Sequence, residues 1–330
     1  MADKLDIRNT ERLALKYLEM DARMSFSTIG KKLKKSQQQI SYTVNSMVRK
    51  GILQKFYTVM DYSKFGAISF RVYFRVNYID EKRFLEFIKH LAKDSHVSRI
   101  SACGGRYDLL CNFLTYNPSK FNKNLRAIIE KFSEQVHDYL ILTNIVTREY
   151  GRKYLMKEIL PEHIVGGDRY PENIDDADMQ ILSQISEDAR KSSVDIASSL
   201  SVNPKTVINR IKKLKQKKVI RCFRPQINPE KAGMASYMLM LKYHNISAKE
   251  EKELVNFLRI HKNILRLTKT IGKWDMEIEI EVKNPMELRK VEMQMRQKFS
   301  SIIQNISAIP VYYTYKYSYF PEFILEDQNR

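Results

Sequence analysis

The spacing of apolar residues changes along the chain, and it changes in the same order in both halves. Within the first sixty residues apolar side chains recur every three or four positions, as on one face of a helix. The stretch ISFRVYFRV (68–76) alternates instead, as a half-buried strand does. Helical spacing returns at 81–92, and two β-rich stretches follow at 97–103 and 107–115. A helix from Pro118 to about residue 132 and a closing strand at 137–150 complete the order βαββαβ, which is typical of a ferredoxin-like sandwich.

The second half repeats the first at one constant offset. Asp21-Ala22-Arg23 recurs as Asp188-Ala189-Arg190, an offset of 167 residues, and the same offset pairs Asn117-Pro118 with Asn284-Pro285. No gap is needed from about Arg8 to Tyr150, so the chain is predicted to hold two copies of one unit. The elements of the second sandwich are predicted as strand 235–243, helix 249–260, strands 264–270 and 274–282, helix 285–299 and strand 305–317.

Each copy begins with a segment that is predicted to form three helices. RLALKYLEM places Leu13, Tyr17 and Met20 on one face of the first helix, and STIGKKL forms a short second helix. Ser36 is a good N-cap for the third helix, because Gln39 three residues later completes a capping box. In the second copy Asn203 takes the N-cap position, with proline at the first helical position.

A short β-rich segment follows the three helices in each copy. GILQKFYTVM and VIRCFRPQI have the composition of the two arms of a hairpin, and three helices with a hairpin form a winged helix-turn-helix. The predicted fold class is therefore α+β, with two tandem copies of a winged helix-turn-helix domain followed by a ferredoxin-like domain. The predicted boundaries are 1–62 and 63–153 for the first copy, 154–173 for a linker, 174–230 for the second helix-turn-helix, and 231–330 for the second sandwich with a C-terminal tail.

A helical wheel separates a core face from an outer face on both third helices. Ile40, Val44 and Met47 form the core stripe of the first, and Val207, Ile211 and Leu214 form that of the second. The outer faces carry amide, hydroxyl and cationic groups that can reach base edges or phosphates. The expected DNA-binding residues are Ser36, Gln37, Gln38, Ser41, Tyr42, Asn45, Arg49, Lys50, Asn203, Lys205, Thr206, Ile208, Asn209, Arg210, Lys212, Lys213, Arg221 and Arg224. Arg210 lies nearer the core flank and is assigned to a phosphate or a packing contact.

The distribution of charge favours a nucleic-acid partner. The net charge is +19 and the isoelectric point about 9.6. The segment 25–60 holds seven Lys or Arg and the segment 196–229 holds nine, and neither contains Asp or Glu. An ordinary solvated helix mixes both signs, whereas two acid-free basic windows repel themselves unless a polyanion is bound. A single capped helix in each copy favours duplex DNA, since the aromatic and GXXG motifs of RNA-binding modules are absent.

Other classes of protein find little support in the composition. No apolar run reaches the length of a membrane span, and the first residues lack the apolar stretch of a signal peptide, so a cytoplasmic location and no membrane partner are expected. The three cysteines are scattered without metal-ligand spacing. No metal, cofactor or catalytic residue is therefore predicted, and the protein is not expected to be an enzyme.

The residues 174–233, IDDADMQILSQISEDARKSSVDIASSLSVNPKTVINRIKKLKQKKVIRCFRPQINPEKAG, resemble the N-terminal domain of the Lrp/AsnC family of feast/famine transcriptional regulators. The GxYD-like element of the family's second domain, also called the RAM domain, is present as GGRYD (104–108) and IGKWD (271–275). The first copy is the looser match, because Thr43 stands where the family usually has an arginine and Gly30 replaces a small helical residue. The family's chains usually hold one copy.

This resemblance implies a DNA-binding regulator of prokaryotic type whose ferredoxin-like domains pair through their sheets. Two such domains are expected to pair within one chain as a pseudo-dimer, and chains are expected to associate further. The family often binds an amino acid at this interface, so the resemblance also implies a possible small-molecule effector. The effector-binding positions that carry over are Gly104, Gly105, Arg106, Asp108, Gly272, Lys273 and Asp275.

Two alternatives remain open on the sequence alone. A nucleoid-architectural protein that coats DNA with little sequence preference fits the charge equally well. Sirohaem decarboxylases share the architecture without binding DNA, but they need histidines and arginines that hold a tetrapyrrole. The six histidines of this chain do not pair at the 167-residue offset, and the basic windows have no purpose in such an enzyme.

Overall fold

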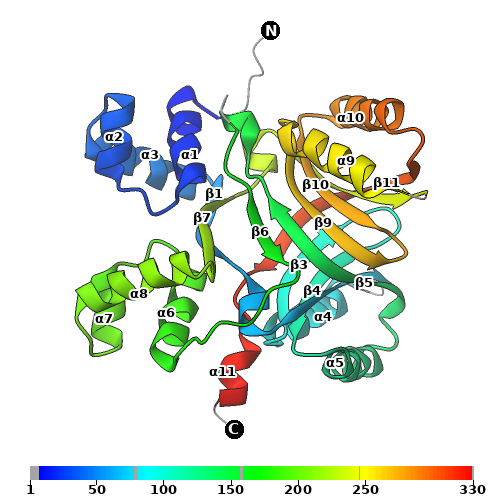
Figure 1. Cartoon of the computed structure of the whole chain (residues 1–330), viewed down its shortest axis with the longest axis horizontal. Helices are drawn as coiled ribbons and strands as arrows, with labels where there is room; N and C mark the ends of the chain where they lie inside the picture. Colours follow the sequence, from blue (N-terminus) through cyan, green and yellow to red (C-terminus); the bar gives the residue numbers. More distant parts are fainter. Residues whose placement is uncertain (1–6, 78–79, 157–158, 245, 329–330) are drawn as a thin grey trace.

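The computed structural model describes residues 7–77, 80–156, 159–244 and 246–328 (Figure 1). The ends of the first and last predicted domains and residues 157–158 of the predicted linker lie outside these ranges. Two helical heads, one from each half of the chain, stand beside a large closed sheet that is covered by helices (Figure 1). Among the described residues, no helix is long and apolar enough to cross a lipid bilayer.

The two heads have the same three helices followed by one strand. The elements of the first head are α1 (Asn9–Met20), α2 (Phe26–Leu33), α3 (Gln37–Arg49) and β1 (Leu53–Met60). Those of the second are α6 (Asp176–Glu187), α7 (Ser193–Ser199), α8 (Pro204–Gln216) and β7 (Ile220–Ile227). The predicted capping box is confirmed: the Ser36 hydroxyl accepts from the Gln39 N–H at 3.1 Å, and the Gln39 side chain accepts from the Ser36 N–H at 2.9 Å. Asn203 caps α8 by accepting from the Lys205 N–H at 2.8 Å.

The core faces predicted for the two third helices are confirmed. The face predicted for the first helix is wrong. All three apolar residues predicted for the stripe are buried on α3 and again on α8. On α1 the buried residues are instead Glu11, Ala14, Leu15, Leu18 and Glu19, while Met20 is 46% exposed. The sequence RLALKYLEM has apolar residues on both flanks, and the buried flank packs both on α2 and α3 of its own head and on β7 of the other half.

The predicted winged helix-turn-helix is wrong, because neither head has a hairpin of its own. β1 and β7 pair with each other, antiparallel, in a two-stranded sheet that both heads share. α1 packs against β7 and α6 against β1, so each head rests on the strand of the other copy. The backbone N–H of Ala22 donates to Phe223 O at 3.1 Å, and that of Ala189 donates to Phe56 O at 2.9 Å. A lone strand needs a partner for its backbone groups, and here the duplicated strand supplies it.

The remainder of each half follows the order βαββαβ. The first set is β2 (Ile68–Val76), α4 (Glu81–Lys93), β3 (Val97–Cys103), β4 (Leu109–Thr115), α5 (Pro118–Lys131) and β5 (Val136–Glu149). The second set is β8 (Ala235–Tyr243), α9 (Ala248–Ile260), β9 (Ile264–Gly272), β10 (Met276–Val282), α10 (Pro285–Lys298) and β11 (Ile303–Tyr317). Short 3-10 turns, η1 (Tyr62–Phe65) and η3 (Glu230–Ala232), join each head to its first sandwich strand. The predicted boundaries at 62/63 and 230/231 fall inside these turns.

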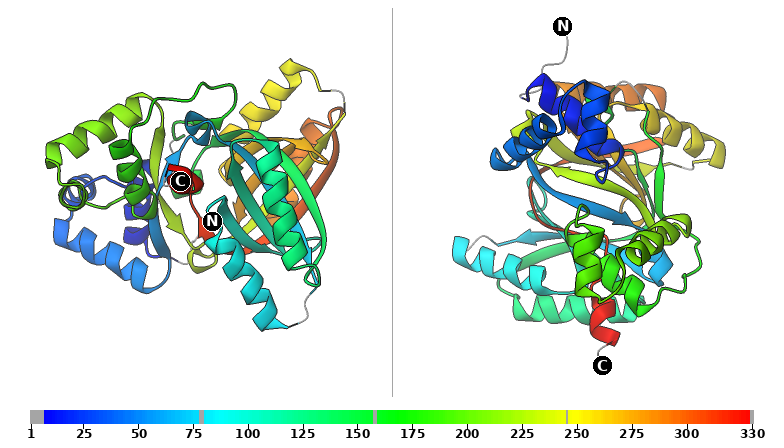
Figure 2. Two further views of the ribbon diagram at one scale, coloured as in Figure 1. Left: turned by 90° about the horizontal axis from the view of Figure 1, so that it is seen from below. Right: turned by 90° about the vertical axis from the view of Figure 1, so that its left-hand side faces the viewer.

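The two sandwiches join edge to edge into one closed barrel. The strand order is β2-β4-β3-β11-β8-β10-β9-β5, and β5 pairs back onto β2. The seams between the halves are β3 with β11 and β5 with β9, so the sandwiches pair within one chain, as the sequence predicted. The four helices of the sandwiches lie on the outside of the barrel (Figures 1 and 2).

Barrel closure has a consequence for further assembly. We expected chains to associate through remaining sheet edges, and in this sheet β6 (His163–Gly166) pairs on one side only, with β5. β6 lies in the predicted linker 154–173 and pairs with β5, so this segment is in part a strand rather than a plain connection. The C-terminal segment that carries α11 (Phe323–Gln328) packs back between the second head and the first sandwich, where Phe320 meets Phe65 and Phe323 stacks on His96.

The barrel interior has an apolar end and a charged end. Tyr73, Leu110, Met238, Met240 and Trp274 form part of a small apolar cluster that also holds Cys103. The outward face of β10 packs under the helices, so Glu277, Glu279 and Glu281 point into the barrel and meet arginines there. The charged end faces the shared β1–β7 sheet.

Candidate functional site

The two third helices lie on the same side of the molecule, away from the barrel (Figure 2). Most of the side chains predicted to contact DNA are exposed on them. On α3 and its N-cap these are Ser36, Gln37, Gln38, Tyr42, Asn45, Arg49 and Lys50, with Ser41 half-buried. On α8 and its N-cap they are Asn203, Lys205, Thr206, Ile208, Asn209, Lys212 and Lys213. The outer faces predicted for these two helices are therefore exposed.

Some of these side chains already have a partner within the protein. The Lys50 ammonium lies 2.7 Å from Glu11, which neutralises part of its charge. The Arg49 guanidinium stacks over the Tyr42 ring at 5.7 Å. Tyr42 is 68% exposed and Ile208 54% exposed, so both large side chains project into solvent from the middle of their helices. An exposed apolar residue at such a position suits a contact with a thymine methyl group.

Arg210 holds α8 against its own head. Its guanidinium donates to Asp175 at 2.7 Å and to Asp178 at 2.8 Å, both at the start of α6. Of the phosphate and packing contacts considered for this residue, the structure supports the packing contact. The hydrogen bonds from Arg210 and from the Asp178 N–H outweigh burial and lower the pKa of Asp175.

Arg221 and Arg224 do not lie on the exposed faces of α3 and α8, and their assignment to DNA binding is corrected. Both are on β7, inside the joint between heads and barrel. Arg221 pairs with the fully buried Asp61, which also accepts from the Gly166 N–H at 2.8 Å. Arg224 is 2% exposed and donates to the backbone carbonyl of Glu19. The sequence showed basic residues after a helix-turn-helix but not that their strand is covered by the other copy.

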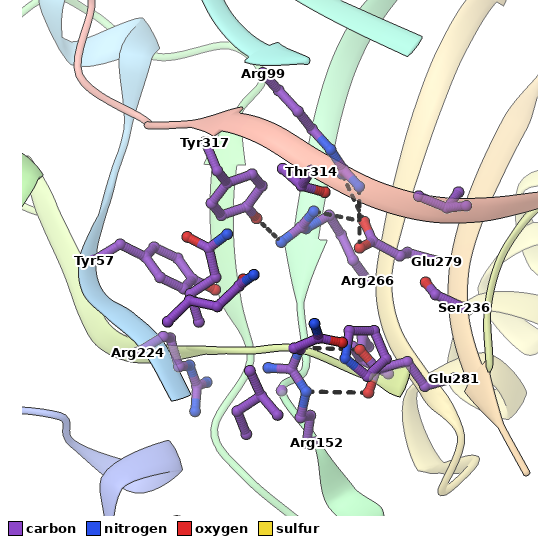
Figure 3. A pocket seen from close by; sticks show the side chains of 18 of the residues that line it. Tyr57, Arg99, Arg152, Arg224, Ser236, Arg266, Glu279, Glu281, Thr314 and Tyr317 are labelled. Atoms are coloured by element: carbon purple, nitrogen blue, oxygen red, sulfur yellow. Dashed lines mark hydrogen bonds and ion pairs between the residues drawn. The ribbon is translucent and has the colours of Figure 1, made fainter. Parts of the chain in front are cut away.

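A pocket of about 80 Å³ lies between the charged end of the barrel and the shared β1–β7 sheet (Figure 3). We call it the head–barrel pocket. Its walls come from three parts of the molecule: Glu19 from α1, Tyr57, Arg224 and Gln226 from the shared sheet, and Arg99, Arg266, Glu279 and Glu281 from the barrel. Glu149, at the end of β5, Arg152, just after β5, and Tyr317, at the end of β11, also line the pocket.

Three of the four lining arginines are hydrogen-bonded to glutamates (Figure 3). Arg99 donates to Glu279 at 2.8 Å, and Arg266 donates to Glu279 at 2.7 Å and to Glu149. Arg152 donates to Glu281 at 2.9 Å. Burial would raise the pKa of Glu279, but the charges of Arg266 and Arg99 outweigh it and hold that pKa well below its usual range. These groups form closed, mutually neutralised pairs.

The fourth lining arginine and one lining glutamate are less well paired. The carboxylate oxygen nearest to Arg224 is Oε1 of Glu19, at 3.8 Å. Oε2 of Glu19 accepts no hydrogen bond among the described residues, and the nearest cation to it is Arg152 at 3.7 Å. Oε1 of Gln226 is likewise buried without a donor. The head side of the pocket thus presents two buried acceptors without a donor, beside an arginine that donates to a backbone carbonyl.

The loops predicted to bind an effector have other contacts. The Asp108 carboxylate accepts from the Val76 N–H at 2.7 Å, and the Asp275 carboxylate accepts from the Tyr243 N–H at 2.8 Å and from Lys242 at 2.9 Å. Both aspartates therefore tie a loop to the end of β2 or β8. Gly104, Gly105 and Arg106, and likewise Gly272 and Lys273, lie outside the lining of the head–barrel pocket. Gly104 packs against the ring of Tyr312, and Gly105 and Gly272 adopt the positive φ of tight turns.

Among the described residues, the side chains that could bind a metal ion or provide a reactive thiol do not form a site. In the part of the chain that the structure describes, no three His, Cys, Asp or Glu side chains could hold a metal ion. The three cysteines are buried, and burial raises the pKa of Cys222 to about 11. None of the six histidines is among the residues that line the head–barrel pocket.

The comparisons with known proteins bear first on the second head. Residues 174–215 match the family model of the AsnC-type helix-turn-helix domain. The transcriptional regulator Ptr1 of Methanocaldococcus jannaschii is 32% identical over 102 residues, which is 31% of this chain and 68% of that protein. The regulator FL11 of Pyrococcus abyssi is 29% identical over 116 residues, which is 35% of this chain and 76% of that protein.

The likeness to one enzyme of known structure extends over nearly the whole chain. The sirohaem decarboxylase NirDL superposes with a TM-score of 0.61 at 13% identity, covering 98% of this chain and 99% of that one. At this identity the likeness concerns the fold alone. The sequence relationship to Ptr1, together with the matched helix-turn-helix domain, places this chain in the family of AsnC-type helix-turn-helix transcriptional regulators.

Proposed function

We propose that this protein is a sequence-specific DNA-binding transcriptional regulator that reads two different half-sites with the two heads of one chain. The observation that carries the proposal is the set of exposed polar and basic side chains on the outer faces of α3 and α8, two helices on one side of the molecule (Figure 2). Phosphate contacts by the lysines and arginines would position the protein, and the polar side chains between them would read base edges. A cytoplasmic location accords with this role.

The fixed joint between the heads supports reading at a defined spacing. Besides sharing the β1–β7 sheet, the heads exchange arginines: Arg23 donates to Ala189 O at 2.7 Å, and Arg190 donates to Met24 O at 2.9 Å. Two helices held in this way present themselves to DNA as one body. Half-sites about one helical turn or a multiple apart are the geometric expectation for such a pair.

The chemistry of the two reading faces supports unlike half-sites. At the 167-residue offset Gln38 corresponds to Lys205, and Tyr42 corresponds to Asn209. An amide grips adenine well, whereas a lysine prefers the acceptors of guanine. Two identical heads would select a palindrome, but these two heads differ at the positions that face outward.

Selection of binding sites from random duplex DNA tests the proposal. We expect an enriched site with two non-identical halves at a constant spacing. A perfectly palindromic site would contradict independent reading by the two heads. Binding without any enriched sequence would favour the alternative of a DNA-coating, nucleoid-architectural protein, and no binding to duplex DNA at low salt would overturn the proposal altogether.

A second candidate function follows from the shape shared with NirDL over the whole chain. One structure of that enzyme is a complex with an iron-uroporphyrin III analogue. In this chain, however, three of the four pocket arginines are neutralised by glutamates, no histidine lines the pocket, and a tetrapyrrole is several times larger than about 80 Å³. Incubation of the purified protein with sirohaem decides between the two functions. Absorbance of bound tetrapyrrole together with loss of its carboxyl groups would support the enzymatic function, and we expect neither.

A further inference from the structure

The last strands of the two halves differ in whether a further strand covers their edge. β9 occupies one side of β5; on the other side β2 pairs as far as Asn144, and β6 continues from Val146 to Glu149. The 167-residue offset relates β5 to β11, which has β3 on one side and, on the other, β8 as far as Val311. Among the described strands, none continues along β11 after β8. We call residues 313–316 on that side the free edge of β11.

Two hollows adjoin the free edge. Tyr312, Tyr313 and Thr314 line the head–barrel pocket of about 80 Å³. Tyr313 and Thr314 also line an open groove of about 390 Å³ that extends to Glu322 in the C-terminal segment. Gln226 of the shared sheet borders both hollows. Pocket and groove therefore lie next to each other along the free edge.

In the other half of the barrel, β6 fills the corresponding place. The offset relates Tyr312 to Ile145, whose carbonyl accepts from the Gly167 N–H at 2.8 Å, directly after β6. Val165 of β6 is fully buried in a hydrophobic cluster. The cavity that remains in that half measures about 30 Å³. The larger hollows thus lie where the described part of the second half has no counterpart of β6.

The side chains along the free edge have the character of a protein interface. Tyr312, Tyr313 and Tyr315 are 65%, 49% and 39% exposed, and the rings of Tyr313 and Tyr315 meet edge to face at 4.8 Å. Tyrosine is enriched at protein interfaces. The register against β3 shifts at Tyr312 and again at Tyr315, and such bulges turn an edge away from pairing with another sheet. A single extended segment such as β6 therefore fits this edge better than the sheet of a second copy does.

The head–barrel pocket defines one side chain of such a segment. In the other half Val165 lies opposite Thr147, the counterpart of Thr314. Opposite residues of an antiparallel pair project on the same face, so a residue opposite Thr314 is expected to point into the pocket that Thr314 lines (Figure 3). Glu19 Oε2 and Gln226 Oε1 are buried there without a donor. Both atoms accept hydrogen bonds and one is anionic, so a lysine side chain suits this position.

We propose that the free edge of β11 is the docking site of a partner protein that adds one extended strand to it, as β6 is added to β5. The partner segment pairs its backbone with residues 313–316 and places a lysine opposite Thr314, in the head–barrel pocket. Backbone pairing supplies affinity and the inserted side chain supplies specificity, as in other cases of strand addition. The described residues that line the pocket and the groove include none from α3 or α8, so partner and DNA use different surfaces.

Peptides with the sequence of the protein's own linker test the site on the full-length chain. One probe is the peptide of residues 160–168, LPEHIVGGD, and the second is the same peptide with Val165→Lys. We expect both to bind in fluorescence anisotropy, the lysine peptide about 10- to 100-fold more tightly because of a charged hydrogen bond. No binding by either peptide overturns the proposal. Equal affinity of the two overturns the lysine assignment.

A third peptide tests whether the backbone makes the contact. It carries methyl groups on the amide nitrogens of Ile164, Val165 and Gly166, which then have no hydrogen to donate to a strand edge. We expect its binding to be lost, since each missing hydrogen bond weakens binding about 2- to 10-fold. Binding as tight as that of the unmethylated peptide overturns strand addition.

Variants of the protein locate the bound peptide. Tyr313→Ala and Tyr315→Ala remove exposed rings beside the free edge, and each should weaken both peptides about 5- to 30-fold, as truncation of an important interface tyrosine does. Tyr139→Ala, at a tyrosine of β5 that is 41% exposed, is the matched control and should bind as the wild type does. Gln226→Leu should reduce the preference for lysine and leave the affinity for the valine peptide unchanged. Unchanged binding by both edge variants overturns the proposed location.

Two further measurements identify other occupants of an edge. A photoreactive group in place of the Ile164 side chain of the peptide should crosslink to residues 312–318. Crosslinks to residues 145–149 would show that the peptide displaces β6, and they overturn the proposal. Sedimentation velocity of the protein without peptide should show no self-association that the peptide abolishes. Such self-association would assign the free edge to a second copy of this chain and overturn a separate partner.

Discussion

Strands β4 and β10 occupy equivalent places in the two halves of the barrel, but the side chains that they point into its interior differ in charge. On β10 the inward residues are Glu277, Glu279 and Glu281, whereas their counterparts on β4 are Leu110, Asn112 and Leu114. The arginines that meet these glutamates come mainly from the first copy, as Arg71, Arg99 and Arg152. In these three pairs the first copy supplies the arginine and the second the glutamate, while the pair of Arg266 with Glu149 runs the other way.

This asymmetry explains why the two halves of one chain pair with each other, and not each half with the same half of a second chain. Two first copies would bury Arg71 and Arg99 without the glutamates of β10 that pair with them, and two second copies would bury six glutamates of β10 in one barrel. A buried charge without a partner is strongly unfavourable. Pairing of like copies is therefore less stable than it would be if the barrel interior were apolar. Charge complementarity inside the barrel therefore favours the pairing of the two unlike halves.

The largest expected effect comes from breaking one buried pair. Arg71 and Glu277 are 2.6 Å apart and almost fully buried. Glu277→Leu installs the residue that β4 carries at this place and leaves the guanidinium unpaired, so we expect a loss of about 3–5 kcal/mol in the free energy of unfolding. Urea denaturation at neutral pH measures this loss.

The matched control exchanges both partners for the residues of the other copy. Arg71 corresponds to Met238, so Arg71→Met combined with Glu277→Leu removes the pair without leaving a lone charge. We expect this double variant to recover to within about 1–2 kcal/mol of the wild type, with the remainder due to the Tyr73 hydroxyl, which loses its acceptor. A double variant as unstable as Glu277→Leu would show that the pair stabilises the barrel by more than charge compensation.

A second difference between the copies makes stability depend on pH. Lys153 is 5% exposed and donates to Arg259 O at 2.6 Å, whereas the offset places buried Phe320 at the equivalent position. Burial and the nearby Arg259 lower the pKa of Lys153 to about 7. Between pH 7 and about 10.4, the ordinary lysine value, the unfolded chain binds more protons at this site than the folded chain. Stability should therefore rise with pH in this window, by at most about 1.4 kcal/mol per unit.

Thermal unfolding between pH 7 and 9.5 tests this contribution against Lys153→Met. The variant removes the ammonium group and keeps an unbranched side chain of similar length. We expect the free energy of unfolding of the wild type to increase relative to that of the variant as pH rises. A difference that stays constant over this range would show that Lys153 remains charged in the folded protein.

The sequence predicted those parts of the fold that depend on local pattern. Helical spacing and caps placed α3 and α8 and their buried stripes correctly, since a stripe such as Val207, Ile211 and Leu214 has one way to be buried. The βαββαβ order also follows from local alternation. The face of α1 and the pairing of β1 with β7 depend on which distant strand arrives, and no local rule contains that information.

The candidate site divides in the same way. The exposed reading residues follow from a helical wheel, but Arg224 looked like one more basic residue of the head because its burial depends on closure of the joint. The stretch MEIEIEV (276–282) does contain a pattern from which the charged interior could have been predicted. Strict alternation of glutamate with apolar residues, in a strand already expected to pack under helices on one face, indicates a charged opposite face that needs cationic partners.

The two reading helices provide the next comparison. Gln38→Ala should relax preference at one half-site only, by about 1–3 kcal/mol for a lost base contact, because α8 has lysine at the equivalent position. Gln38→Lys, which gives the first head the residue of the second, should shift that half-site toward guanine. Site selection with each variant checks both statements. Equal changes in both halves of the site would show that the heads do not read independently.

The smallest expected effect concerns the salt dependence of DNA binding. Exposed Lys212 on α8 corresponds to exposed Asn45 on α3, so the heads differ there by one charge. Each neutralised phosphate contributes about −0.9 to the slope of log affinity against log salt concentration. If Lys212 contacts a phosphate, Lys212→Asn should make the slope shallower by about 0.9 on every duplex, cognate or not, while Asn45→Ala leaves the slope unchanged and weakens the cognate site alone. Fluorescence anisotropy with labelled duplexes between about 50 and 200 mM salt separates the two outcomes. An unchanged slope in Lys212→Asn, together with altered site preference, would assign Lys212 to base reading instead of to the backbone.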